Sequence, residues 1–159
     1  MTTQEASDIN YDIESKNAHR YVSMRIDSQL FGMKVEKIED ILMPQEITPI
    51  PLSGEEIIGS LNLRGRIVTA IDLRVVLGIP KLEERKDYRS IVIICNNELY
   101  SLVVDSVSEV FNIPSSAISK NPENLSDKWK EICNGVYSVK DELMIILDPT
   151  KLLKVESDE

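Results

Sequence analysis

The apolar and polar positions of this chain follow a pattern that occurs twice. Residues 21–41 match residues 90–110 at an offset of 69, by residue class more than by identity. In the first copy Val22, Met24 and Ile26 alternate with polar residues, which predicts one face of a strand. A turn at residues 27–29 and a second apolar run at residues 30–35 complete a predicted hairpin.

The second part of each copy aligns at an offset of 76. Gly59 then falls on Gly135, and Asp72 falls on Asp148. The repeat predicts two copies of one small β unit, and a groove between two copies is a natural place to bind another molecule.

Residues 34–43 are ambiguous, because their apolar positions have helical spacing. The matching residues of the second copy are rich in valine, which favours a strand with a bend. Residues 55–58 are expected to form one helical turn. Residues 61–63 and 67–71 predict two strands joined at Arg64-Gly65, where glycine permits a positive φ.

Short helices are expected after Asp72 and after Asp148-Pro149, since a carboxylate caps a first helical turn and proline fits its first position. Residues 1–18 are polar and acidic, which is typical of a disordered tail. Residues 81–87 predict a charged linker, and residues 112–130 predict an irregular or partly helical insert of the second copy.

Composition limits the partners that this chain can have. Its formal net charge is -9 and its sequence pI is about 4.7, which disfavours nucleic acid and anionic membrane surfaces as ligands. Cys95 and Cys133 are expected to be free thiols, and no segment resembles a signal peptide or a membrane helix. These features predict a cytoplasmic protein with one domain, or with two small halves that share a core.

Residues suited to catalysis are scarce. The single histidine, His19, lies in the predicted tail, so neither a metal cluster nor a Ser/His/Asp relay is expected. Asp72 and Asp148 occupy equivalent positions and could form an acid hydrolase dyad. Their sequence contexts fit helix caps far better, and we therefore expect no catalytic residue, no cofactor and no metal.

Two features instead suggest a binding site. Arg64-Gly65-Arg66 places two cations around a turn, whereas the second copy has Lys140-Asp141-Glu142 there, so we expect Arg64 to be free for a carboxylate or carbonyl partner. The apolar residues after each first hairpin are expected to be mostly core, but a remainder could form a docking strip between the halves. This set comprises Val35, Ile38, Ile41, Val103, Val107 and Val110.

A longer motif resembles a known family. The motif is an Asn-Leu-Arg-Gly sequence, a following apolar strand and an Asp-Leu pair, and it is similar to that of CheW-like domains. It runs Gly59-Ser60-Leu61-Asn62-Leu63-Arg64-Gly65-Arg66-Ile67-Val68 and continues to Ile71-Asp72-Leu73. The resemblance extends from about Arg20 to Val155. It implies a mainly β fold of two SH3-like five-stranded β-barrels packed together, with short helices.

The expected domain therefore covers residues 19–155, with a short tail at 156–159. Its first barrel would span about 20–80 and its second about 88–155, with an exchange of strands between the halves left open.

The resemblance also implies a function and a site. Proteins of this family are adaptors that connect the cytoplasmic hairpin tips of chemoreceptors to the regulatory domain of the histidine kinase CheA. Matched position by position, the protein-binding residues would be Ile38, Asp40 and Ile41 with Val107 opposite, together with Gly59 and Arg64. Thr69 departs from the family pattern, in which proline is common. A generic SH3-like module for peptides of another signalling pathway is the alternative.

Overall fold

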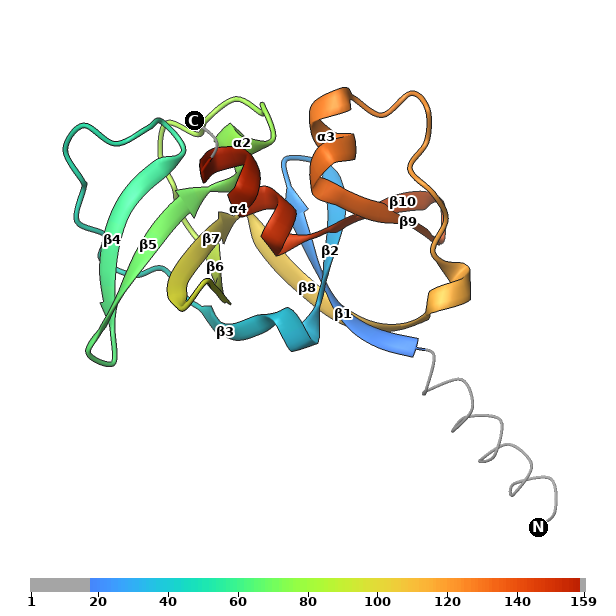
Figure 1. The fold of residues 1–159 in the computed structure, drawn as a ribbon, viewed down its shortest axis with the longest axis horizontal. Coiled ribbons are helices and arrows are strands. Elements are labelled where there is room, and N and C mark those ends of the chain that lie inside the picture. The colour runs from blue at the N-terminus through green and yellow to red at the C-terminus, as the bar shows by residue number, and fades with distance from the viewer. Residues whose placement is uncertain (1–17, 158–159) are drawn as a thin grey trace, which may run out of the picture.

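The structure, a computed structural model, describes residues 18–157, and these residues form two lobes that each contain a five-stranded sheet (Figure 1). The sheet of the first lobe has the order β8-β1-β2-β10-β9. Its strands are β1 (Ala18–Ile26), β2 (Gln29–Lys34), β8 (Ser106–Pro114), β9 (Cys133–Val139) and β10 (Glu142–Leu147). The sheet of the second lobe has the order β3-β6-β7-β5-β4. Its strands are β3 (Ile38–Leu42), β4 (Ile57–Leu63), β5 (Arg66–Asp72), β6 (Arg89–Cys95) and β7 (Glu98–Val104).

The two lobes have the same strand order. The strands of the two sheets correspond one to one and in the same order: β8, β1, β2, β10 and β9 correspond to β3, β6, β7, β5 and β4. These pairs follow the offsets of 69 and 76 in the sequence. Even the one parallel pairing of each sheet is matched, because β2 lies beside β10 and β7 lies beside β5. The prediction of a mainly β chain with two five-stranded units is therefore confirmed.

The lobes are not the two halves of the chain. Each first hairpin joins the last three strands of the other copy, so residues 20–80 and residues 88–155 both contribute strands to both sheets. Strands are therefore exchanged between the halves, the possibility that the sequence left open, and the barrels do not correspond to residues 20–80 and 88–155. The exchange begins after β2, where the short 3-10 helix η1 (Val35–Lys37) leads the chain away from its own hairpin and into the other sheet.

Most of the large apolar side chains belong to a core that joins the lobes. This central core contains Met24 and Phe31 from the first sheet and Ile91, Ile93 and Leu102 from the second, and all five are fully buried. Two smaller clusters, one in each sheet, fill the lobes themselves. Because the largest cluster spans both sheets, burial of apolar surface stabilises the pair of lobes as one unit.

Helices close the ends of the sheets. α2 (Leu73–Val76) and α4 (Pro149–Ser157) follow the equivalent strands β5 and β10, and each begins at the aspartate predicted to cap it. Asp72 accepts a hydrogen bond from Arg74 N at 2.9 Å, and Asp148 accepts one from Thr150 N at 2.9 Å. No helix within residues 18–157 is long and apolar enough to cross a membrane.

The predicted insert at 112–130 contains the end of β8, the short 3-10 helix η2 (Ser115–Ala117) and most of α3 (Asp127–Ile132). Trp129 of α3 donates from Nε1 to the carbonyl of Leu77 at 2.7 Å, and its ring contacts Phe31 with centroids 5.5 Å apart. The insert therefore packs against both lobes.

Some local predictions need correction. Residues 55–58 form a turn and the start of β4 instead of a helical turn. His19 lies in β1 opposite Ile113, so it is not part of a tail. Of the predicted tail at 1–18, only Ala18 lies within the described residues, where it begins β1. Residues 156–157 belong to α4, and the rest of the short C-terminal tail lies outside the described residues.

Candidate docking site at the seam

β3 and β8 are the strands that cross from one copy to the other, and each contains a bulge at the same place. In β3, Ile38 lies opposite Ile93 and Ile41 lies opposite Ile91, so four residues of β3 match three of β6. In β8, Val107 lies opposite Met24 and Val110 opposite Val22. A bulge shifts the alternation of a strand by one residue, so side chains three positions apart share a face. This explains the three-residue spacing of Ile38 and Ile41. The predicted strand with a bend is confirmed for Ile38–Leu42, whereas Val35–Lys37 form the 3-10 helix η1.

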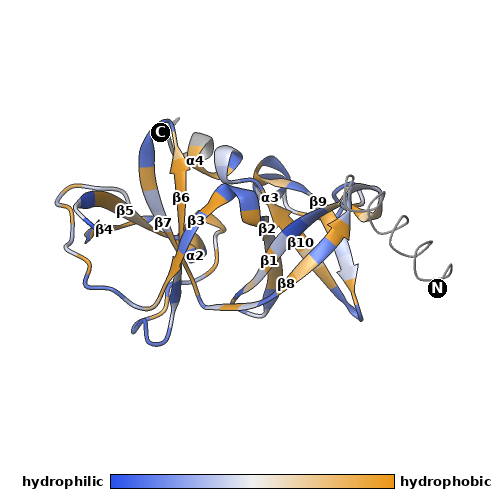
Figure 2. Cartoon of the chain, turned by 90° about the horizontal axis from the view of Figure 1, so that it is seen from below, coloured by the Kyte–Doolittle hydropathy of each residue, from blue (hydrophilic) through white to orange (hydrophobic). Residues whose placement is uncertain are grey.

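On both β3 and β8, the face that carries these side chains borders the central core at one end and is open to solvent at the other. Ile38 and Val107 are half-buried and pack against the central core. Ile41 is 39% exposed and Val110 is 53% exposed. We call these four residues the seam strip. Figure 2 shows the apolar stretches of β3 and β8 that carry it.

Arg64 and Asp40 form a second group at the edge of the second lobe. The turn between β4 and β5 places Arg64 at φ 52° and Gly65 at φ 85°, as the sequence predicted for this position. Arg64 Nη2 lies 3.2 Å from Asp40 Oδ2. We had expected Arg64 to be free, but it is already paired within the chain. Exposed pairs of this kind contribute about 0.2–1 kcal/mol, so a partner could replace it at low cost.

Gly59 has a structural position. It lies in the bulge of β4 against the isolated bridge between Thr48 and Ser60, and a Cβ atom there would lie 2.1 Å from the carbonyl oxygen of Thr48. Gly135, its counterpart in β9, faces Ser119 in the same way, with a Cβ distance of 2.5 Å. A partner could sense Gly59 only through the shape of the backbone around it.

An ion-pair cluster connects the two lobes. Arg74 of α2 donates from Nη2 to Asp105 at 2.6 Å, and Asp27 in the turn between β1 and β2 lies 3.7 Å from the same nitrogen. The backbone N–H of Asp27 also donates to Asp105 Oδ2 at 2.7 Å. The hydrogen bond with Asp105 raises the pKa of Arg74 above its usual value. This cluster ties the first hairpin to the second lobe and so holds the two sides of the seam in register.

Of the predicted site residues, the structure places Ile38, Ile41 and Val107 on equivalent faces at the seam and brings Asp40 together with Arg64. It places Gly59 away from both groups, in the backbone of β4. Val110 belonged to the apolar set predicted from the pattern but not to the site that the resemblance implied, and its position is equivalent to Ile41 at the offset of 69.

The catalytic alternative finds no support in the geometry. Asp72 and Asp148 cap helices in different lobes and bind different partners, Arg85 and Asn134. Within residues 18–157, no group of three or more histidine, cysteine or acidic side chains could hold a metal ion. Both cysteines are free, and burial raises the pKa of Cys133 to about 12, which leaves its thiol protonated and unreactive near neutral pH.

The chain is thus a two-lobed β protein with exposed apolar residues at equivalent places on β3 and β8, and comparison with known proteins gives its family. A family model described as a CheW-like domain matches residues 20–157. The chemotaxis protein CheW of Thermotoga maritima is 32% identical over 133 residues, 84% of this chain and 86% of that protein. The CheW of Helicobacter pylori is 26% identical over 95% of this chain and 91% of its own length.

A solved structure agrees. The crystal structure of the scaffolding protein TtCheW from Thermoanaerobacter tengcongensis superimposes with a TM-score of 0.76 at 30% identity, and the match covers 84% of this chain and 86% of that one. The chain belongs to the CheW-like domain family.

Proposed function

We propose that this protein is a chemotaxis adaptor that couples the cytoplasmic hairpin tips of chemoreceptors to the regulatory domain of the histidine kinase CheA. In this role it has no catalytic activity. It transmits the state of the receptor by contact, in the cytoplasm and next to membrane-bound receptor arrays. Its family supports this proposal. So do relatives that are named chemotaxis proteins and that match most of this chain.

The observation that carries the proposal is the seam strip. Ile41 and Val110 expose apolar surface at equivalent places, one on each of the strands that cross between the lobes. An amphipathic receptor helix could bind by packing apolar side chains, about one turn apart, against this exposed surface. Each well-buried anchor contributes about 1.5–3 kcal/mol, so three or four of them suffice for micromolar affinity after the costs of ordering.

Asp40 and Arg64 would supply the polar edge of this interface. Their ion pair is solvent-accessible, so a partner carboxylate could take the guanidinium while Asp40 turns to a partner cation. We assign both residues to the kinase or receptor interface, and we assign Gly59 to the backbone that shapes it.

The test is a substitution on the strip with a matched control. We expect Ile41→Asp to weaken binding of a receptor hairpin-tip fragment at least tenfold, measured by titration calorimetry, because a desolvated carboxylate replaces an apolar anchor. Leu143→Asp is the control, since Leu143 is 38% exposed, almost the same as Ile41, but lies in β10. Binding that is unchanged in Ile41→Asp, or equally weakened in both variants, would show that the site lies elsewhere. Binding to unrelated peptides but not to receptor tips would favour a generic peptide-binding module.

A further inference from the structure

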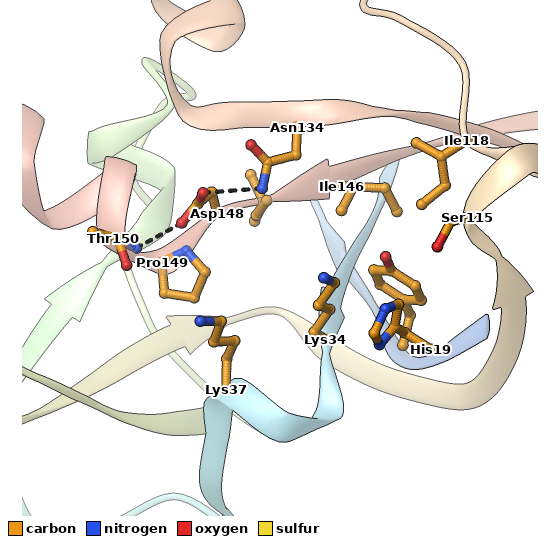
Figure 3. A pocket seen from close by; sticks show the side chains of 12 residues that line it. His19, Lys34, Lys37, Ser115, Ile118, Asn134, Ile146, Asp148, Pro149 and Thr150 are labelled. Carbon is orange, nitrogen blue, oxygen red and sulfur yellow. Dashed lines mark hydrogen bonds between the residues drawn. The ribbon is translucent and has the colours of Figure 1, made fainter. Parts of the chain in front are cut away.

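A second candidate site lies at the end of the first lobe, next to the start of α4. There the structure has a cavity of about 550 Å³. Figure 3 shows side chains from β1, β2, η1, β9 and α4 that point into it, and most of them are polar or charged. They include His19, Lys34, Lys37, Asn134, Asp148 and Thr150.

The equivalent place in the second lobe is covered by the chain itself. The linker between the copies passes over it, and Arg85 of this linker donates from Nη2 to Asp72 at 2.7 Å. Asp72 is only 2% exposed as a result. Three residues further along, Tyr88 is buried and its hydroxyl donates to the carbonyl oxygen of Gln45 at 3.1 Å. The segment that precedes β6 therefore closes this end of the second lobe.

The corresponding groups of the first lobe are more open. Asp148, the counterpart of Asp72, is half-exposed, and its Oδ2 accepts a hydrogen bond from Asn134 Nδ2 at 3.0 Å (Figure 3). The side chain of His19, the counterpart of Tyr88, is 38% exposed. The described chain begins at Ala18, directly before this residue that lines the cavity.

The sequence before β1 resembles the linker that covers the second lobe. At the offset of 69 that relates β1 to β6, Ile13 matches Leu82, Glu14 matches Glu83 and Lys16 matches Arg85. We propose that the cavity is the docking site of the chain's own residues 11–17, with Lys16 directed to Asp148 as Arg85 is to Asp72.

Charge complementarity supports this occupant over others. Two cavity residues, Lys34 and Lys37, are cations in a chain whose net charge is -9. The segment provides Asp12 and Glu14 for these ammonium groups and Lys16 for the carboxylate. A segment tethered directly at the rim of the cavity also binds at a high effective concentration, so weak contacts suffice.

The experiment compares amide NMR spectra of the full chain with those of a chain that lacks residues 1–17. We expect removal of the segment to shift the side-chain amide signal of Asn134 and the backbone signal of Thr150, while Gly65, in the distant β4–β5 turn, keeps its position. Lys16→Glu should reproduce most of these shifts in the full chain, and Lys16→Arg should not, because it retains the positive charge. Arg85→Glu is the matched control on the linker, and it should leave Asn134 unchanged.

Two results would overturn the proposal. One is that the signals of Asn134 and Thr150 coincide in the full and shortened chains, or respond equally to Lys16→Glu and Lys16→Arg. The other is that the shifts grow with protein concentration, since the occupant would then be the segment of a second copy. Neither result bears on receptor binding at the seam strip, which the titration with Ile41→Asp tests separately.

Discussion

Gly59 and Gly135 illustrate what single residues contribute to this protein. Each lies where a neighbouring loop comes too close to leave room for a side chain. Next to each glycine, a pair of backbone hydrogen bonds of 2.8–2.9 Å joins the loop to the strand, between Thr48 and Ser60 in one lobe and between Ser119 and Val136 in the other. The two glycines align in the sequence because both copies of the β unit need the same close approach. Their role is to keep the backbone in place, so a loss of binding on substitution would follow from a change of shape.

We therefore expect Gly59→Ala to lower the free energy of unfolding by about 1–3 kcal/mol, since its Cβ would overlap the carbonyl oxygen of Thr48. Urea unfolding followed by circular dichroism measures this loss. Gly65→Ala is the control, because no atom lies within 4 Å of its Cβ position and only its positive φ is unfavourable, which costs about 1 kcal/mol. A larger loss in Gly65→Ala than in Gly59→Ala would contradict the account.

At the scale of the elements, the bulges in β3 and β8 decide which residues form the proposed docking strip. Without the extra residue, Ile38 and Ile41 would point to opposite faces of the sheet, since neighbours in a strand alternate. With it, both face the seam, opposite Ile93 and Ile91. The sequence showed the three-residue spacing but could not show the bulge, because the same spacing also fits a helix.

The helix caps show how equivalent elements differ in their surroundings. Asp72 caps α2 and its buried carboxylate also binds Arg85, whose side chain is 28% exposed, whereas Asp148 caps α4 and binds Asn134. A cap of either kind contributes about 1 kcal/mol. Loss of Asp72 would also leave the Arg85 guanidinium without its carboxylate partner.

We expect Asp72→Ala to lower the free energy of unfolding by about 2–4 kcal/mol and Asp148→Ala by about 1 kcal/mol. Chemical denaturation of the two variants measures the difference. Combining Asp72→Ala with Arg85→Met should restore part of the loss, because no unpaired cation then remains. Equal losses in the two single variants would mean that the pair with Arg85 contributes nothing.

At the scale of the whole molecule, the exchange of strands makes each lobe depend on both copies. The central core includes residues from β1, β2, β6 and β7, and Arg74 links α2 to the turn of the first hairpin. Residues 38–104 contain all five strands of the second sheet, whereas the first sheet combines β1 and β2 with β8, β9 and β10 from the other end of the chain. Because the central core joins the lobes, they should unfold together, and the orientation of the seam strip should be as stable as the fold itself.

We expect a fragment of residues 18–80 to remain unfolded, because its hairpin β1–β2 and its strands β3–β5 belong to different sheets and would each lack their partners. Dispersion of amide signals in an NMR spectrum is the measurement. When the fragment is mixed with residues 81–157, the dispersed spectrum of the intact chain should return. A folded fragment on its own would show that each half can close its own barrel.

The sequence by itself determined the elements, the duplication and the local caps, because these depend on side-chain alternation, turn chemistry and short-range hydrogen bonds. Val22, Met24 and Ile26 predict a strand whichever sheet it joins. Asp148-Pro149 likewise predicts the start of a helix whichever lobe contains it. The tertiary structure alone decided which copies of the strands pair, where Arg64 finds its carboxylate and which end of a lobe stays open. Exchanged and unexchanged pairing bury the same apolar faces, so only the path of the chain through η1 and the central core distinguishes them.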